Sequence, residues 1–180
     1  MRIGIDISQI VYEGTGVATY VRNIVRSLLA HDKNNTYILF GSSFRKKFIF
    51  DEYFNEINKI NKNVSLVSVA IPPTLLDILW NKLHIMPIEK LIGPVDVFWS
   101  SDWTQPPLGR ARGVTTIHDL IALKFPDETD KKIVATHKRR LAWVKKECTA
   151  IFCDSQSTKK DVMELLHISE NKLYVVYPGL

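Results

Sequence analysis

The feature that most constrains the fold is a regular alternation of short apolar runs with longer amphipathic stretches. The runs are rich in Val, Ile, Tyr and Phe, as strands are, and the stretches between them carry apolar residues at helical spacing. In a chain of 180 residues with 46% hydrophobic residues, this alternation predicts one domain around a parallel sheet. The predicted strands are Arg2–Ile7, Tyr37–Phe40, Val64–Ala70, Asp96–Ser100, Val114–His118, Ala150–Cys153 and Leu173–Val176.

Helices are expected between these strands. The clearest is Val17–Ala30, and Thr74–Lys82, with Thr74 as its N-cap, Asp130–Glu147 and Ser157–Leu166 follow. Residues 45–63 are polar, basic and Asn-rich, and are predicted to be a peripheral helix and loop outside the core. Since such crossovers are right-handed, the pattern predicts a Rossmann-like, doubly wound α/β fold, a mainly parallel sheet of about seven strands with helices on both faces.

A candidate site follows from this fold class, because open α/β sheets bind ligands beyond the carboxyl ends of their strands. In the common strand order, the first and fourth strands flank the point where the order reverses. The polar residues at the ends of four strands are then expected to converge on one edge, where the glycine loop lies opposite Asp102 with His118 alongside. They are Asp6, Gly14 and Gly16 at the first strand, Ser101, Asp102 and Trp103 after the fourth, His118 and Asp119 after the fifth, and Asp154 and Ser155 after the sixth.

The glycine loop does not match the best-known phosphate motifs. A dinucleotide fingerprint needs a third glycine where Thr19 stands, a tighter approach than residues 8–13 allow, and an acidic residue after the second strand. A Walker motif is also absent from the sequence, so nicotinamide dinucleotides and triphosphates are disfavoured. Two interpretations stay open: the amides of Gly14 and Gly16 face a phosphate or sugar hydroxyl at a helix N-terminus, or the glycines only permit a turn.

The other candidates also have two interpretations each. His118, beside the carboxylate of Asp119, is placed to bond a sugar hydroxyl or to stabilise developing charge, but a strand-end histidine is also often satisfied by the backbone. Asp102 and Trp103 combine a hydroxyl acceptor with an apolar stacking surface, although such a Trp is more commonly a buried loop anchor. The sequence shows no metal-ligand spacing and no activated nucleophile, so we expect no metal cofactor.

The bulk properties favour anionic partners in a reducing compartment. The net charge is +5 and the pI about 9.2, and two cysteines, Cys148 and Cys153, are too few for a disulfide framework. Asp6 interrupts the run that a secretory signal would need, and no window is as long and apolar as a membrane span. We therefore expect a cytoplasmic protein, with peripheral contact at the inner membrane surface as an alternative.

The stretch 131–146 is the most basic of the chain. With Trp143, its charges are suited to an anionic membrane surface, but they are also what the solvated face of a helix carries. We favour the solvated face, because a seam of apolar positions is expected to face the core, made of Ile133, His137, Leu141, Val144 and Cys148. The basic residues are Lys131, Lys132, Lys138, Arg139, Arg140, Lys145 and Lys146. No recognition motif for nucleic acid accompanies them.

Six stretches together resemble a known family. They are "RIGIDIS" with "GTGVATYVRNIVRSLL", "YILF", "TTIHDL", "CDSQSTKKDV" and "LYVVYPGL", and they are similar in order and spacing to the N-terminal domain of retaining glycosyltransferases of GT-B fold. The nearest resemblance is to group 1, or family 4, which includes many mannosyl- and glucosyltransferases. The family usually shows Gly-Gly-x-Gly or Thr-Gly-x-Gly at the loop, followed by an Arg or Tyr, whereas this chain has the stretch "GTGVATY", with Ala18 at the site that is commonly basic or small.

The resemblance implies an enzyme that transfers a hexose from a sugar nucleotide to a glycan or lipid-linked acceptor, without a metal. It places Gly14 and Gly16 near the donor diphosphate, His118 against the sugar, and Asp102 at acceptor or sugar contacts. Ser155 and Thr158 match residues that begin a helix, and we interpret them as caps.

In the family, the terminal Tyr-Pro-Gly leads into a second domain that binds the donor. We therefore expect residues 1–180 to be one acceptor-side domain, inactive by itself. A different class of protein stays open, a non-catalytic module that binds a nucleotide or glycan or docks onto a partner.

Overall fold

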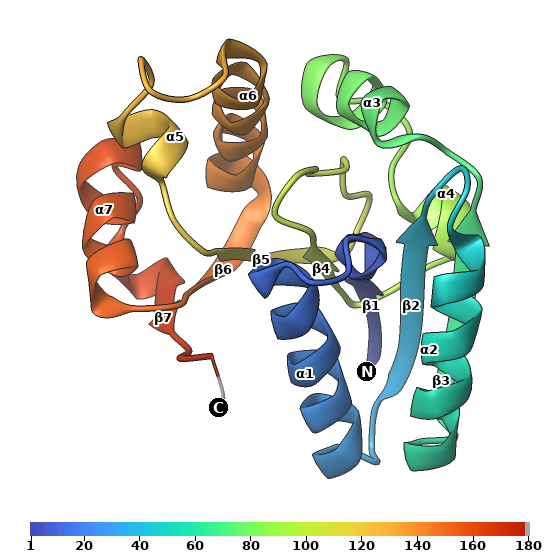
Figure 1. Cartoon of the computed structure of the whole chain (residues 1–180). Coiled ribbons are helices and arrows are strands. Elements are labelled where there is room, and N and C mark those ends of the chain that lie inside the picture. Colours follow the sequence, from blue (N-terminus) through green and yellow to red (C-terminus); the bar gives the residue numbers. More distant parts are fainter. Residues whose placement is uncertain (179–180) are drawn as a thin grey trace.

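The computed structural model describes residues 1–178, so Gly179 and Leu180 at the end of the Tyr-Pro-Gly motif lie outside the described part. One seven-stranded sheet, parallel at every pairing, runs through the described chain in the order β3-β2-β1-β4-β5-β6-β7. This confirms the predicted Rossmann-like, doubly wound fold and all seven strands (Figure 1). The strands are β1 (Arg2–Asp6), β2 (Thr36–Ser42), β3 (Val64–Val69), β4 (Val97–Ser100), β5 (Arg112–Ile117), β6 (Cys148–Cys153) and β7 (Leu173–Val175).

The helices connect the strands largely as the periodicity predicts. Three of them begin at side-chain caps, Thr15 for α1, Asp130 for α6 and Ser155 for α7, whose side chains accept hydrogen bonds from Ala18 N, Lys132 N and Thr158 N. The helical elements are η1 (Ser8–Val11), α1 (Gly16–His31), α2 (Lys47–Ile60), α3 (Pro73–Leu76), η2 (Asp77–Lys82), α4 (Glu89–Ile92), α5 (Ile121–Lys124), α6 (Lys131–Glu147), α7 (Gln156–Leu166) and η3 (Glu170–Lys172). None of the helices in residues 1–178 combines the length and hydrophobicity that crossing a bilayer requires.

Strand β2 shows why both faces of the sheet are covered. Its side chains alternate: Tyr37 and Leu39 lie in a core cluster with α1 and α2, whereas Ile38 and Phe40 lie in a second cluster with η2 and α4. All four side chains are buried, as expected for a parallel strand between two helical layers. A third cluster joins β5, β6 and β7 to α6 and α7.

The prediction that residues 45–63 lie outside the core is wrong. Most of this stretch is helix α2, and Ile49, Phe50, Tyr53 and Ile57 on it are buried in the core cluster with α1 and β2. Phe50 packs directly over Gly41, where an added Cβ would lie 2.7 Å from the ring. The polar composition concealed four apolar residues at helical spacing, and these decide the burial.

Thr74 is not an N-cap. The helix begins one residue earlier, at Pro73, with Pro72 in the extended cap position and no side-chain cap bond. A proline is well suited to the first helical turn, because its fixed φ is helical and its missing N–H needs no partner there. The helix then continues as the π-helical segment η2 up to Lys82.

Candidate functional site

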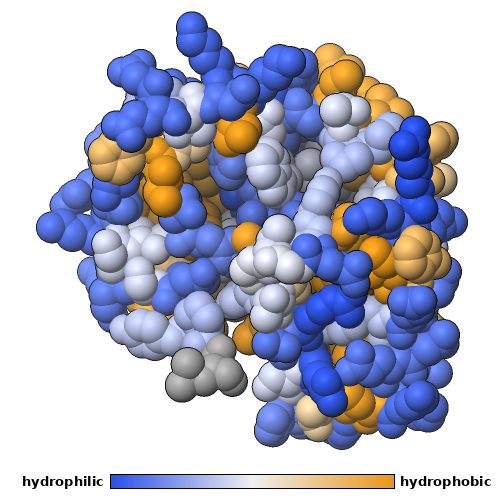
Figure 2. All heavy atoms as spheres, in the orientation of Figure 1, coloured by the Kyte–Doolittle hydropathy of each residue, from blue (hydrophilic) through white to orange (hydrophobic). Residues whose placement is uncertain are grey.

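A large hollow of the described chain lies at the edge where the strand order reverses. Strands β1 and β4 are neighbours there, and the chain proceeds outward on either side. A cleft of about 930 Å³ opens at their carboxyl ends, between α3 and η2 on one side and α5 and α6 on the other. Figure 2 shows hydrophobic side chains over the α3 side and over the α5–α6 side, with a hollow between them. This is the position that the sheet topology predicts for a ligand site.

The outer part of the cleft is apolar and its floor is polar. Ile78 of η2, Ile121 of α5 and Ile133 of α6 line the outer part and are 41%, 55% and 37% exposed. At the floor lie Asp102 and His118, which follow β4 and β5. A ligand with one apolar and one hydroxylated end would match this arrangement.

The glycine loop borders the cleft without lining it at the glycines themselves. Tyr12, Thr15 and Val17 line the cleft, while Gly14 and Gly16 lie between them with no atom within 4 Å of a Cβ added to either. Gly14 has φ +82°, which favours glycine, but Gly16 is the first residue of α1 and has no such requirement. The turn interpretation therefore accounts for Gly14 only, and Gly16 leaves the α1 N-terminus open to approach.

His118 is held by Asp154 rather than by the adjacent Asp119. Its Nδ1 lies 2.6 Å from Asp154 Oδ2, and Tyr20 of α1 packs edge-on to the imidazole at 4.8 Å. The bond pairs residues that follow the neighbouring strands β5 and β6. Because a carboxylate only accepts, Nδ1 carries the proton and donates it, which leaves Nε2 as an acceptor in the neutral ring. The suggestion that Asp119 orients His118 is wrong, since Asp119 accepts from the Ile121 N–H at the start of α5.

The remaining predicted residues gather at the cleft. Asp102, Trp103 and Asp119 all line it. Trp103 is 37% exposed and lies 5.1 Å from the His137 ring, so it is a surface of the cleft and not a buried anchor. One carboxylate oxygen of Asp102, Oδ1, is buried without a hydrogen-bond partner.

Asp6, at the end of β1, is a buried carboxylate at the edge where the strand-end residues were expected to converge. It is 4% exposed, its Oδ1 accepts from Ser8 N, and its Oδ2 has no partner. Burial raises the pKa of Asp6 to about 6, and the nearby Asp102 carboxylate adds to this rise. Asp6, Tyr20, Asp102 and His118 surround a small cavity of about 20 Å³ beside the cleft, enough for one hydroxyl group or water.

The basic stretch of α6 is only partly a solvated face. Arg140 is 2% exposed, and its Nη2 donates to Thr115 Oγ1 at 2.7 Å and to Thr116 O at 3.1 Å. Arg139 pairs with Asp77 of η2 at 2.8 Å. The seam also differs from the prediction, because Ile133 is exposed while Val134 is buried. The helix is rotated so that a charged residue, Arg140, faces the cleft floor.

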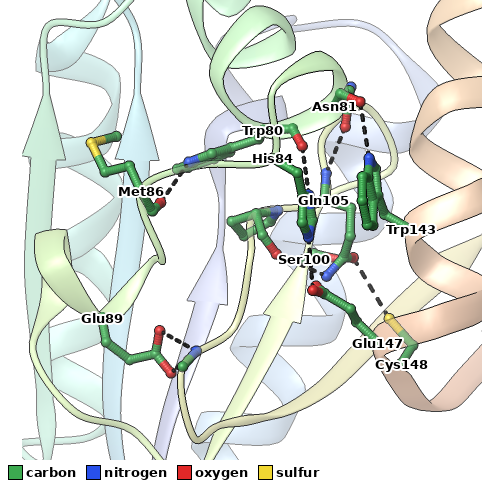
Figure 3. A network of polar contacts seen from close by, with 12 residues as sticks. Trp80, Asn81, His84, Met86, Glu89, Ser100, Gln105, Trp143, Glu147 and Cys148 are labelled. Atoms are coloured by element: carbon green, nitrogen blue, oxygen red, sulfur yellow. Dashed lines mark hydrogen bonds and ion pairs between the residues drawn. The ribbon is translucent and has the colours of Figure 1, made fainter.

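A polar network ties η2 to α6, the two walls of the cleft (Figure 3). His84 stacks on Trp143 at 3.6 Å between ring centroids, its Nδ1 lies 2.8 Å from Trp80 O, and its Nε2 lies 2.7 Å from Glu147 Oε1. Trp143 Nε1 donates to Asn81 O. Since both acceptors of His84 can only accept, the ring meets both when it carries two protons. The two walls are thus fixed relative to each other by contacts outside the cleft lining.

Residues 14–180 match the model of the family described as Glycosyltransferase Family 4. The chain belongs to this family. Among curated proteins, no sequence matches it. A solved structure, a short-chain dehydrogenase from Oenococcus oeni PSU-1, is similar with 9% sequence identity and a TM-score of 0.45, covering 99% of this chain and 96% of that one. The fold of this chain is defined by its own strand order, β3-β2-β1-β4-β5-β6-β7.

The match places this family 4 chain among glycosyltransferase domains, and it includes the glycine loop and the His118 region. The strand-end argument brought Asp6 and Asp154 to this edge without including them among the site residues, and it missed Arg140. Arg140 carried no sequence signal that separates it from the lysines around it.

Proposed function

We propose that this chain is the acceptor-side, N-terminal domain of a retaining glycosyltransferase of GT-B type. The complete enzyme would transfer a hexose, mannosyl- or glucosyl-like, from a sugar nucleotide to a glycan or lipid-linked acceptor. The observation that carries the proposal is the family 4 match over residues 14–180, which coincides with a cleft at the switch point of the sheet. A second domain outside residues 1–180 would hold the donor nucleotide.

In this proposal, His118 bonds the sugar or stabilises charge that develops on it. The Asp154 carboxylate holds Nδ1 at 2.6 Å, which fixes the ring and leaves Nε2 to contact the substrate. The open N-terminus of α1, capped by Thr15, offers its dipole to the leaving diphosphate. Gly14 and Gly16 would allow the close approach that this contact needs.

The proposed reaction needs no metal cofactor. The bond from the anomeric carbon of the donor to its phosphate oxygen breaks, and a bond from that carbon to the acceptor oxygen forms on the same face. The hydroxyl proton of the acceptor passes to the leaving diphosphate. Asp102 and Trp103 would orient the acceptor, the first through a hydroxyl and the second through stacking on a sugar ring.

The apolar outer cleft supports a lipid-linked form of the acceptor. Ile78, Ile121 and Ile133 would contact the lipid chain, and Lys131 and Lys132, both exposed at the start of α6, would lie near an anionic bilayer surface. Peripheral membrane contact would then bring the cleft to its substrate. Sedimentation with vesicles of anionic and of neutral phospholipids tests this part, and equal binding to both would contradict it.

The test of the proposal is sugar transfer by the complete enzyme, in which this chain is accompanied by its donor domain. A panel of UDP-, GDP- and ADP-hexoses is offered with the acceptor mixture, and the anomeric configuration of the product is read by NMR. His118→Ala should lower kcat by ~10²-fold or more, because positioned acid–base and charge-stabilising groups contribute that much. His31→Ala, at the exposed end of α1, is the matched control.

Unimpaired transfer by His118→Ala would remove His118 from the site. Inversion of configuration would refute the retaining mechanism. Absence of transfer with every donor, together with tight binding of a nucleotide or glycan, would favour the non-catalytic binding module. The chain of residues 1–180 alone should bind sugar nucleotides poorly by calorimetry.

A further inference from the structure

Four charged side chains at the cleft floor each retain an unused hydrogen-bonding atom. Among the described residues, seven buried side-chain atoms have no partner, and five of them belong to this region: Asp6 Oδ2, Tyr20 OH, Asp102 Oδ1, Arg140 Nε and Asp154 Oδ1. Burying such atoms without partners costs free energy that a fold normally avoids. Their concentration at one edge of the sheet points to a ligand that supplies the missing partners.

A chain of hydrogen bonds places Arg140 beside Asp102. Arg140 Nη2 donates to Thr115 Oγ1, and that hydroxyl is within 3.3 Å of Ser100 O and 3.5 Å of Ser101 O, one residue before Asp102. Both Arg140 and Asp102 line the cleft. The carboxylate of Asp102 also partly offsets the lowering of the Arg140 pKa by burial, as a nearby opposite charge does.

The chemistry of the unused atoms defines the class of ligand. Arg140 Nε can only donate and the carboxylate oxygens of Asp102 and Asp6 can only accept, and a hydroxyl group does both. An anion would be attracted by the guanidinium of Arg140 but repelled by the carboxylates of Asp102 and Asp6. This group of charges therefore does not favour a phosphate or a carboxylate. The adjacent cavity of about 20 Å³ accommodates one such hydroxyl group.

We propose that Arg140 and Asp102, with Asp6 behind them, form a seat for a neutral polyhydroxylated group, the sugar or polyol part of the acceptor. Arg140 Nε donates to one of its hydroxyls and Asp102 Oδ1 accepts from one. The seat thus selects a neutral sugar against phosphorylated and acidic ones. It rests on the proposed function only in assigning the bound group to the acceptor.

The test observes the Nε–H of Arg140 directly by ¹⁵N NMR of the 180-residue protein. Titration with methyl α-D-mannopyranoside, methyl α-D-glucopyranoside or myo-inositol should shift this signal saturably with at least one of them. Inorganic phosphate should require a roughly tenfold or higher concentration for the same shift, since a charged hydrogen bond is worth about that factor or more. An excess of sugar nucleotide should leave the glycoside-induced shift in place.

Asp102→Asn supplies a second, independent outcome. The change removes one carboxylate charge and keeps the shape of the side chain, so Arg140 is less compensated. The preference should then move from the neutral glycoside toward phosphate, by roughly ten- to a hundredfold in the ratio of their affinities. Asp51→Asn, an exposed position on α2 outside the cleft, makes the same chemical change and should leave the ratio unaltered.

Three results would overturn the proposal. They are an Arg140 signal that no neutral probe shifts, a wild-type preference for phosphate, and an unchanged preference in Asp102→Asn. Displacement of the glycoside by sugar nucleotide would assign the seat to the donor hexose and refute the acceptor assignment. These readouts need no turnover. An active transferase whose Arg140 signal no glycoside shifts would refute this inference alone. A protein that binds the glycoside but transfers no sugar would refute the proposed function alone.

Discussion

Replacing the buried Asp6 by Asn should change how the stability of the protein depends on pH. The structure places the carboxylate at the end of β1, 4% exposed and with one oxygen unpartnered, and burial raises its pKa from 3.8 to about 6. A rise of about two pKa units corresponds to about 3 kcal/mol, because each unit is worth about 1.4 kcal/mol. Asp6→Asn removes the charge and keeps the acceptor for Ser8 N.

The sign follows from proton binding. Between pH 4 and pH 6 the folded state holds the Asp6 proton more tightly than the unfolded state does. The free energy of unfolding of the wild type therefore falls as the pH rises through this window, relative to a protein without the group, and the loss is complete above pH 6. Between pH 4 and pH 8, Asp6→Asn should gain about 2.5 kcal/mol on the wild type, because part of the full change of about 3 kcal/mol lies below pH 4. Any change in the free energy of unfolding that the new amide causes equally at every pH cancels in this comparison.

The assay is urea unfolding, followed by the fluorescence of the four tryptophans, for both proteins at intervals between pH 4 and pH 8. Asp51→Asn, exposed on α2, controls for the chemical change without burial. The carboxyl carbon of Asp6, observed by ¹³C NMR, should titrate near pH 6. Parallel stability curves for Asp6→Asn and the wild type would refute the reasoning, since they would mean that folding does not shift this pKa.

Three further predictions concern the cleft and its supports. Gly14→Ala should destabilise the fold by about 1 kcal/mol, because φ is +82° at Gly14. Gly16→Ala should not destabilise it, because Gly16 is helical and an added Cβ meets no atom within 4 Å. Chemical denaturation measures both free energies of unfolding, and equal losses would contradict the φ argument. Asp154→Asn should lower kcat of the complete enzyme by roughly tenfold or more and shift the pH profile of kcat, with little change in KM. The reason is that no carboxylate then holds the proton of His118 at Nδ1. An unshifted profile would mean that Asp154 has only a structural role. Glu147→Gln should cost about 1–3 kcal/mol in the free energy of unfolding, because the 2.7 Å bond from Glu147 Oε1 to His84 Nε2 then loses its charged acceptor; an unchanged free energy of unfolding would contradict a role for this bond in joining the walls.

The sheet and the edge that carries the site could be predicted from the sequence. Each strand of a parallel sheet is buried on both faces and therefore appears as a short apolar run, and the helices between strands carry their own period. The right-handed crossover rule then leaves few topologies, and all of them bring the residues after β1, β4 and β5 together. The positions of Asp102, Trp103, His118 and Asp119 at the cleft follow from local pattern and topology.

The sequence pattern could not predict which of several similar residues makes a given contact. Asp119 is next to His118 in the chain, but Asp154, 36 positions away, makes the bond, since adjacent residues after a strand point apart while the ends of paired strands lie side by side. Arg140 is one of seven basic residues in α6, and only the rotation of that helix against β5 buries it over Thr115. The buried face of α2 was likewise concealed by its polar composition.

By itself, the sequence of this family 4 chain determined the class of fold, the order of its elements and the edge at which a ligand would bind, because those depend on hydrophobic period and chain connectivity. Only the tertiary structure decided which charges lie at the cleft floor, which atoms there stay unpartnered, and which carboxylate holds His118. Those properties depend on distances of a few ångströms between side chains far apart in the chain, and such distances are set by how the helices pack on the sheet.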